Sequence, residues 1–385
     1  MKTILGIFFA ILLLTNCVGK TTTNTTSEPA SEITQPVLEE EQEPEWLTVG
    51  GQRVFNFELY SKYDYYLISE KESIESVKLF VNPKDENYAI NLGGIEQLVN
   101  LRRLHIVGWN LDMLDYSLFN NNLYNLKRLT FESREEYKLT KVPDLRGMVA
   151  RESVINIFFT NCALTNLNNI EFLPNLRHVE VARNNGDFTK IEALNNLQHL
   201  ETLKIYSTKN SIYKIEEIAS LVKLNHLVLS GKLVDVKGIE NLNSLRHIGF
   251  SESNVINTKY LSMLKNVEYL EMMIREPEPD IEFLKSMENL KRLVLYADDD
   301  TWGNETVEKY QILDLGPIGN LSKLSYLELR GFILQNVAAL NKLDNLEQTF
   351  FAHSVLKDSS EISSKKLIFH PDAPNFTPVW GINEW

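Results

Sequence analysis

The sequence VINIFFTNCAL, residues 154–164, places apolar side chains at Val154, Ile157 and Phe159. Ile157 and Phe159 are two residues apart, so on an extended chain they point to the same side. The segment therefore predicts a short strand with one buried face. The residues between them would then lie on the opposite face.

The same spacing, apolar at the first, fourth and sixth residue, recurs along the chain. Examples are LRRLHI from Leu101, LETLKI from Leu200 and LKRLVL from Leu290. Repetition of one short unit predicts a solenoid, in which neighbouring units stack their strands into one parallel sheet and so bury a face that a single unit leaves exposed. The units begin at Ile74, Leu101, Leu126, Val154, Leu176, Leu200, Leu224, Leu245, Val267, Leu290, Leu324 and Leu346.

The chain must return between strands. In TKYLSMLKNV (258–267) and IEFLKSMENL (281–290) apolar residues lie three and four apart, which predicts a short helix or a helical turn. With this return, the pattern resembles the leucine-rich repeat, LxxLxLxxN/CxL, over residues 74–360, in about twelve units. DVKGIENLNSLRHIGF (235–250) is similar to the repeats of bacterial internalins. The resemblance implies an α/β solenoid with a curved parallel sheet on its concave face and short helices or helical turns on its convex face.

The resemblance also implies a role for Cys162, which falls in the buried Asn/Cys place of the motif and is expected to be a structural thiol. Other units depart from the motif at this place, which predicts an incomplete ladder of buried asparagines and irregular turns. The departures are Trp109, Thr208, Lys232, Ser253, Arg275, Asp298 and Phe332.

The N-terminus predicts export. Residues 1–16 hold an apolar run from Ile4 to Leu14, which is too short to span a bilayer but is typical of a signal peptide. LLTNC then resembles a bacterial lipobox, although Asn16 stands where that motif usually has Gly, Ala or Ser. The resemblance implies lipid attachment at Cys17, which would hold the protein on a membrane surface. An ordinary signal peptide, or an N-terminal anchor, with an incidental Cys is the alternative.

The segments that flank the repeats differ from them in composition. Residues 17–45 contain seven Glu and few large apolar residues, which predicts a disordered acidic tether. Residues 46–73 are rich in aromatic residues and do not follow the repeat, so we expect an N-terminal cap. Residues 361–385 contain three Pro and two Trp, which predicts a C-terminal cap.

If the fourth and sixth residues of each unit are buried, the third, fifth and seventh point outward on the concave face. Tyr and Arg are enriched at protein-binding hot spots, and this face is rich in them. The alternative is a structural ladder, in which these side chains pack on one another across the strands. A shallow depression is expected between Val228 and Ser251. The candidate partner-binding residues are Arg103, His105, Arg128, Phe158, His178, Tyr206, His226, His247, Tyr269, Arg292, Tyr296, Tyr326 and Arg330.

Other kinds of site find little support in the sequence. His226 and His247 share a column and offer two ligands, fewer than zinc requires. Ordinary ladder residues are the preferred interpretation. A pH-responsive surface, on which the paired histidines would titrate near neutrality, is preferred to a metal site. The insertion ADDDTWGNETVEKYQ (297–311) lacks a calcium-loop pattern because Trp302 and Lys309 occupy ligand places. No GxSxG, HExxH, P-loop or CxxC motif is present. We therefore expect no enzyme activity, metal or cofactor.

These observations predict a monomeric bacterial lipoprotein, anchored in the cell envelope at the outer membrane or cell surface, whose concave face binds a protein. A net charge of −13 argues against a nucleic-acid partner. A glycan-binding module and a periplasmic interaction scaffold are the alternatives.

Overall fold

The computed structural model divides the chain into two units, Met1–Glu43 and Pro44–Trp385. The first unit, with the expected signal peptide, Cys17 and most of the tether, lies outside the described residues. So do most of the insertion and most of the C-terminal segment. The structure describes residues 45, 47–49, 52–54, 67–81, 92–108, 111, 123–134, 139–146, 148–188, 190–207, 210–275, 280–297, 311–357 and 368–369.

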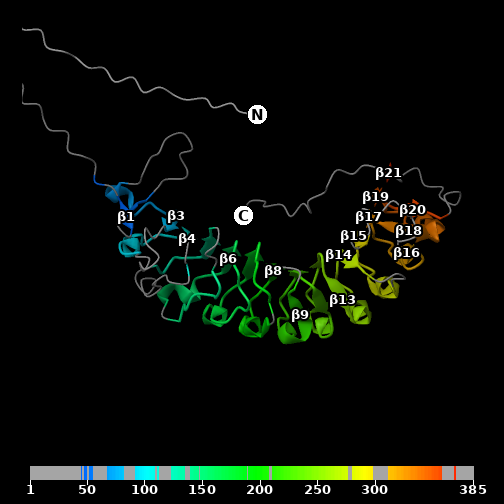
Figure 1. The fold of residues 1–385 in the computed structure, drawn as a ribbon, viewed down its shortest axis with the longest axis horizontal. Helices are drawn as coiled ribbons and strands as arrows, with labels where there is room; N and C mark the ends of the chain where they lie inside the picture. The colour runs from blue at the N-terminus through cyan, green and yellow to red at the C-terminus, as the bar shows by residue number, and fades with distance from the viewer. Residues whose placement is uncertain are drawn as a thin grey trace, which may run out of the picture. The chain divides into compact units, whose positions relative to one another are not determined.

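The second unit is built on a 13-stranded sheet in which every pairing is parallel. The strands follow one another in chain order, because each repeat adds one strand beside the last. Figure 1 shows them along the inner side of an arc. They are β3 (Ser76–Val81), β4 (Arg103–Gly108), β5 (Arg128–Ser133), β6 (Asn156–Thr160), β7 (His178–Ala182), β8 (Thr202–Tyr206), β10 (His226–Ser230), β12 (His247–Phe250), β14 (Tyr269–Ile274), β15 (Arg292–Ala297), β17 (Tyr326–Arg330), β19 (Gln348–Ala352) and β21 (Ile368–Phe369).

The strands form because the apolar frame matches the two-residue period of an extended chain. The fourth and sixth residues of the units, such as Ile157 and Phe159, are buried in one continuous core. Cys162 is also fully buried, in keeping with a structural thiol. The last unit breaks the frame: Thr349 takes the inward place, and its buried hydroxyl has no hydrogen-bond partner among the described residues.

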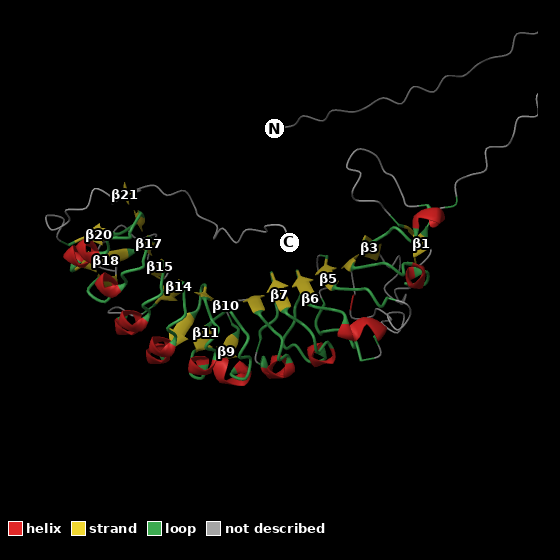
Figure 2. Cartoon of the chain, turned by 180° about the vertical axis from the view of Figure 1, so that it is seen from behind, coloured by secondary structure: helices red, strands yellow, loops and turns green. Residues whose placement is uncertain are grey.

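Shorter elements lie behind the main sheet. Figure 2 shows the helices along the outer side of the arc, which confirms the expected convex side. The described helices are 3-10 helices: η1 (Ile68–Glu70), η2 (Ile95–Gln97), η5 (Val149–Glu152), η6 (Ile170–Phe172), η7 (Glu192–Asn196), η8 (Ile215–Ile218), η9 (Ile239–Asn241), η10 (Thr258–Met263), η11 (Glu282–Ser286), η14 (Ile318–Asn320) and η15 (Val337–Lys342).

Two small parallel sheets and one hairpin complete the described elements. The first small sheet holds β9 (Ile212–Lys214), β11 (Leu233–Asp235) and β13 (Asn254–Ile256). The second holds β16 (Gln311–Asp314), β18 (Phe332–Gln335) and β20 (Val355–Leu356). Near the start of the unit, β1 (Thr48–Val49) pairs antiparallel with β2 (Gln52–Arg53).

Asparagines tie each unit to the one before it. Six units have Asn immediately before their first apolar residue, and in each the side-chain Nδ2 donates to a backbone carbonyl of the preceding unit. These bonds satisfy carbonyls that the turns leave unpaired. They join Asn100 to Glu72 (2.8 Å), Asn125 to Val99 (3.0 Å), Asn175 to Glu152 (2.8 Å), Asn266 to Asn243 (2.9 Å), Asn289 to Lys265 (2.8 Å) and Asn345 to Ser322 (2.7 Å).

Among the described units, the buried turn after the strands is held by an asparagine, Asn184, in one unit and by a serine in several others. Asn184 accepts a hydrogen bond from the Leu164 amide (2.7 Å) and donates to its carbonyl (2.8 Å). In later units a serine hydroxyl accepts from a backbone amide, as Ser253 does from Gly231 (2.9 Å). The Asn ladder is therefore incomplete, as the sequence predicts.

Candidate functional site

The register of the main sheet aligns the outward side chains in columns. His226 pairs with His247 on one side and with Thr202 on the other, and the same register continues to Arg103 and to Gln348. We call the column that begins each strand the ring column. It runs through Arg103, Arg128, Asn156, His178, Thr202, His226, His247, Tyr269, Arg292, Tyr326 and Gln348.

Successive side chains of the ring column contact one another across the strands over its second half, and the last tyrosine contacts Phe350 of the neighbouring column. The rings of His226 and His247 are nearly parallel, with an angle of 15° between their planes. Because the stack runs across the strands, each ring lies against a side chain of an adjacent strand. The contacts are His226 to His247 (4.8 Å), His247 to Tyr269 (4.8 Å), Arg292 over Tyr269 (5.6 Å), Arg292 over Tyr326 (3.8 Å) and Tyr326 to Phe350 (5.4 Å).

A second, shorter stack lies toward the N-terminal end. The Arg128 guanidinium lies 3.9 Å from the centre of the Phe158 ring, and that ring lies 4.8 Å from His178. Arg103 pairs with Arg128 on the next strand. Burial, followed by the charge of Arg103, lowers the pKa of Arg128. His105 lies apart from this stack and faces Glu132 at 3.0 Å.

A second outward column lies two residues further along each strand than the ring column. It holds three carboxylates, and we call it the acid column. Glu180 contacts His178 Nε2 at 3.2 Å, and although burial opposes ionisation, that hydrogen bond and the charge of Lys204 lower the pKa of Glu180. Glu328 accepts from Tyr326 Oη (2.6 Å). Glu271 is the third, and burial raises its pKa.

The tyrosine hydroxyls of the face are engaged with the same carboxylates or with the backbone. Tyr269 Oη donates to Glu271 Oε2 at 2.6 Å, and Tyr296 Oη accepts from the Glu252 amide at 3.2 Å. Burial raises the pKa of Tyr206, of Tyr269 and of Tyr296, and the negative carboxylates nearby raise it further. Burial, followed by the hydrogen bond to Glu328, also raises the pKa of Tyr326. All four hydroxyls therefore remain protonated donors at neutral pH.

Burial lowers the pKa of three histidines on the concave face. Burial, followed by the charge of Lys204, lowers the pKa of His226 to about 3. Burial, followed by the charge of Lys78, lowers the pKa of His105 to about 4. Burial also lowers the pKa of His247. Both shifts argue against titration near neutrality, which a pH-responsive pair requires.

The structure brings most of the candidate residues into contact and leaves some apart. Arg128, Phe158 and His178 form one group, and the ring column from His226 to Tyr326 forms another. Tyr206, Tyr296 and Arg330 flank the second group, and Arg330 Nε donates to Glu328 Oε1 at 2.6 Å. The repeat pattern places Glu180, Glu271 and Glu328 on this face. They were not among the candidate binding residues, because the sequence does not show that a carboxylate will be buried.

Comparison with solved structures identifies proteins with a similar fold. An internalin, InlF, from Listeria monocytogenes aligns over 82% of this chain and 92% of that chain, with a TM-score of 0.54 and 21% identity. The chain is a leucine-rich-repeat solenoid.

Two plant proteins align less well with this solenoid. The peptide hormone receptor RGFR1 in complex with RGF2 has a TM-score of 0.40 and 11% identity, over 72% of this chain and 55% of that chain. The LRR ectodomain of the receptor kinase GASSHO1/SCHENGEN3 from Arabidopsis thaliana, in complex with CASPARIAN STRIP INTEGRITY FACTOR 2, has a TM-score of 0.43 and 13% identity, over 74% and 37%. No family model and no curated protein matches the sequence.

A polar cavity lies at the edge of the solenoid, beside the starts of the strands. Its volume is about 460 Å³. It occupies units in which Lys223 and Ser244 replace the asparagine that links neighbouring units elsewhere. Neither Val228 nor Ser251, between which the sequence predicts a shallow depression, lines this cavity, and both are almost fully buried. The cavity is lined by Glu201, Lys223, Asn225, Asn243, Ser244, Arg246 and Asn266.

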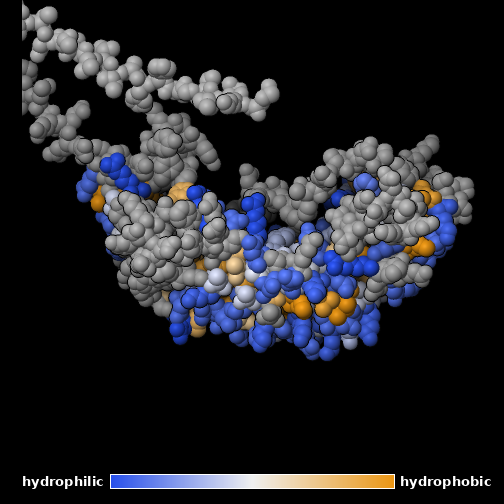
Figure 3. All heavy atoms as spheres, viewed as in Figure 1, coloured by the Kyte–Doolittle hydropathy of each residue, from blue (hydrophilic) through white to orange (hydrophobic). Residues whose placement is uncertain are grey.

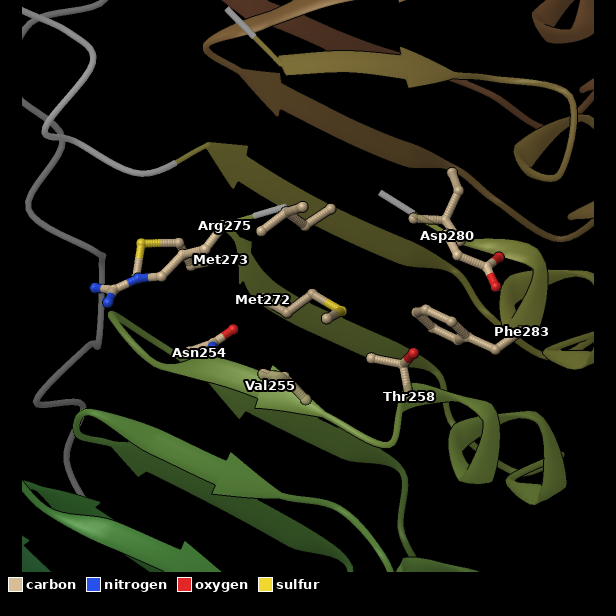
Figure 4. A pocket seen from close by; sticks show the side chains of 10 residues that line it. Asn254, Val255, Thr258, Met272, Met273, Arg275, Asp280 and Phe283 are labelled. Atoms are coloured by element: carbon tan, nitrogen blue, oxygen red, sulfur yellow. The ribbon is translucent and has the colours of Figure 1, made fainter. Parts of the chain in front are cut away.

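A smaller cavity lies where the first small sheet ends, at β13. Figure 4 shows Val255 of β13, Met272 of β14 and Phe283 of η11 around it. Apolar atoms also gather near β13 on the surface in Figure 3. The cavity has a volume of about 30 Å³, which holds a water molecule or two and no organic ligand.

Within the ranges that the structure describes, no three His, Cys, Asp or Glu side chains lie close enough together to hold a metal ion. The candidate calcium insertion lies outside those ranges, apart from its ends. None of the described helices is long and apolar enough to cross a membrane.

Proposed function

We propose that this leucine-rich-repeat protein binds a protein partner through its concave face. The observation that supports this most directly is the ring column. Its rings and guanidinium pack on one another, and such packing restricts their rotamers and lowers the entropy that a partner must remove on binding. Rings, tyrosine hydroxyls and carboxylates then present a fixed pattern of polar groups next to apolar surface, as protein interfaces do.

The glycan-binding alternative is disfavoured by the same geometry. Sugar rings stack on the free faces of aromatic side chains. His226 and Tyr269 lie on either side of the His247 ring, each at 4.8 Å, and Arg292 lies over the Tyr326 ring. The second half of the column therefore offers few free ring faces for a sugar.

The location of the protein is part of the proposal. The N-terminal sequence supports export, lipid attachment at Cys17 and a monomer tethered to the cell envelope, at the outer membrane or cell surface.

Two experiments test this location. If Cys17→Ala protein still partitions into detergent after removal of the signal peptide, the proposal of a lipid anchor is wrong. Protease digestion of intact cells separates a surface protein, which is cleaved, from a periplasmic scaffold, which is protected.

The binding face is tested by a pair of variants. The Tyr269→Ala and Tyr206→Ala double variant should lose partner capture from host or bacterial extracts while its melting temperature changes little. Tyr124→Ala, at an exposed tyrosine outside the concave columns, is the matched control and should retain capture. A large fall in melting temperature of the double variant, without specific loss of capture, favours a purely structural ladder.

A further inference from the structure

Glu271 differs from the other two carboxylates of the acid column in its partners. Glu180 contacts His178, and Glu328 accepts a hydrogen bond from the Arg330 guanidinium. Glu271 receives neutral donors instead: Tyr269 Oη at 2.6 Å on Oε2 and Ser251 Oγ at 3.4 Å on Oε1. No Lys, Arg or His within the described ranges forms an ion pair with it.

The neighbours of Glu271 explain why its charge is not balanced. Gly249 and Val294 occupy the adjacent places in the column, so neither side supplies a cation. Arg292 and Arg330 lie on the next two strands, but Arg292 covers the ring of Tyr326 and Arg330 bonds to Glu328. Glu271 is only 7% exposed, so water compensates the charge of its side chain poorly.

One oxygen of Glu271 has room for another donor. A carboxylate accepts about four hydrogen bonds, and O–H···O bonds of full strength are about 2.5–3.0 Å long. Oε2 has such a bond from Tyr269, whereas the contact of Oε1 with Ser251 is longer. Because the acid column faces outward from the sheet, a further donor would come from the concave side.

We propose that Glu271 anchors a basic side chain, Lys or Arg, of the partner that lies on the concave face. This inference rests on the proposed function and specifies the chemistry of the partner. The carboxylate supplies the opposite charge and a free acceptor for such a donor.

The experiment uses peptides as probes of the full-length protein. Random 12-residue peptides are selected on the wild-type protein, with Tyr269→Ala, Tyr206→Ala protein used to discard those that bind elsewhere. Each selected peptide is then compared with a copy in which one basic residue is replaced by norleucine. We expect one such replacement to weaken binding at least tenfold, which is the loss of one ion pair in a water-poor site. This comparison is made on wild-type protein and does not depend on the folding of a variant.

Protein variants assign the effect to the carboxylate. In Glu271→Gln protein, which keeps the acceptor for Tyr269, the basic peptide should bind no better than its norleucine copy. Glu201→Gln, at the edge of the sheet outside the concave columns, removes the same charge and should keep the preference, which excludes a general attraction to an acidic protein. A preference that persists in Glu271→Gln, or selected peptides that show none, overturns the inference and leaves the proposed function standing. A selection that yields no peptide dependent on the concave face overturns both.

Discussion

We expect acid to destabilise the protein through His226, and His226→Phe to remove that part of the pH dependence. The ring is stacked on His247, and its buried Nε2 atom has no hydrogen-bond partner among the described residues. Burial, followed by the charge of Lys204, lowers its pKa to about 3 in the folded protein. In an unfolded chain the pKa of a histidine is about 6.5.

The sign and size follow from these two pKa values. Between pH 6.5 and about 3 the unfolded chain binds a proton at His226 that the folded protein does not, so stability falls as the pH falls through this window. Each pH unit below 6.5 costs about 1.4 kcal/mol, which gives about 2 kcal/mol at pH 5. Water still reaches part of the ring, and this screening reduces the expected loss to about 1–2 kcal/mol.

The assay is urea unfolding of wild-type and His226→Phe protein at pH 7.5, 6 and 5. Phe keeps a stacking ring but binds no proton, and the other titrating groups are common to both proteins and cancel in the difference. We expect the variant to gain about 1–2 kcal/mol relative to wild type as the pH falls from 7.5 to 5. His199→Gln, at an exposed histidine outside the concave columns, is the control. A stability difference that stays constant with pH would refute the reasoning.

Three further predictions concern the scaffold. Asn266→Ala and Asn266→Asp should each lower stability by about 0.5–1.5 kcal/mol, because both lose the Nδ2 donor to the Asn243 carbonyl; an Asp variant as stable as wild type would show that this bond contributes nothing. Gly238→Ala should lower the melting temperature more than Gly316→Ala, because Gly238 has φ of 95° and an added Cβ would lie 2.8 Å from the Glu216 Cα. Thr349→Val should raise stability by about 1 kcal/mol in urea unfolding, because it removes a buried hydroxyl without a partner and keeps the side-chain shape; a less stable variant would show that the hydroxyl is satisfied.

The sequence predicts the scaffold well because one simple rule generates it. Side chains such as Leu203 and Ile205 alternate with polar ones, and this period alone fixes which residues are buried and which share a column. The register follows, since slipping a strand by one residue would expose Leu203 and Ile205. Asn266 shows what the rule misses: the sequence reveals that asparagine recurs before the strands, but not that it bonds to the preceding unit.

The candidate site is less predictable, because its character depends on how side chains of different strands meet. The sequence places His226, His247 and Tyr269 in one column, but how their rings contact one another depends on their rotamers. It also places Glu271 outward, where exposure is the simple expectation, and the flanking tyrosine and serine bury it instead. Burial of polar groups by their neighbours is therefore the step that the repeat pattern does not contain.

Thr202 interrupts the ring column and divides the concave face into two stacks of side chains. Thr202 separates His178 from His226 by two strand spacings, about 10 Å, which is too far for ring contact. In the adjacent column Glu180 of β7 and Lys204 of β8 occupy neighbouring places in the sheet register. The face thus has a stack of rings on either side of a charged centre. A partner that fits the proposed function must match this alternation, and the gap therefore favours an extended binding mode over a single apolar anchor.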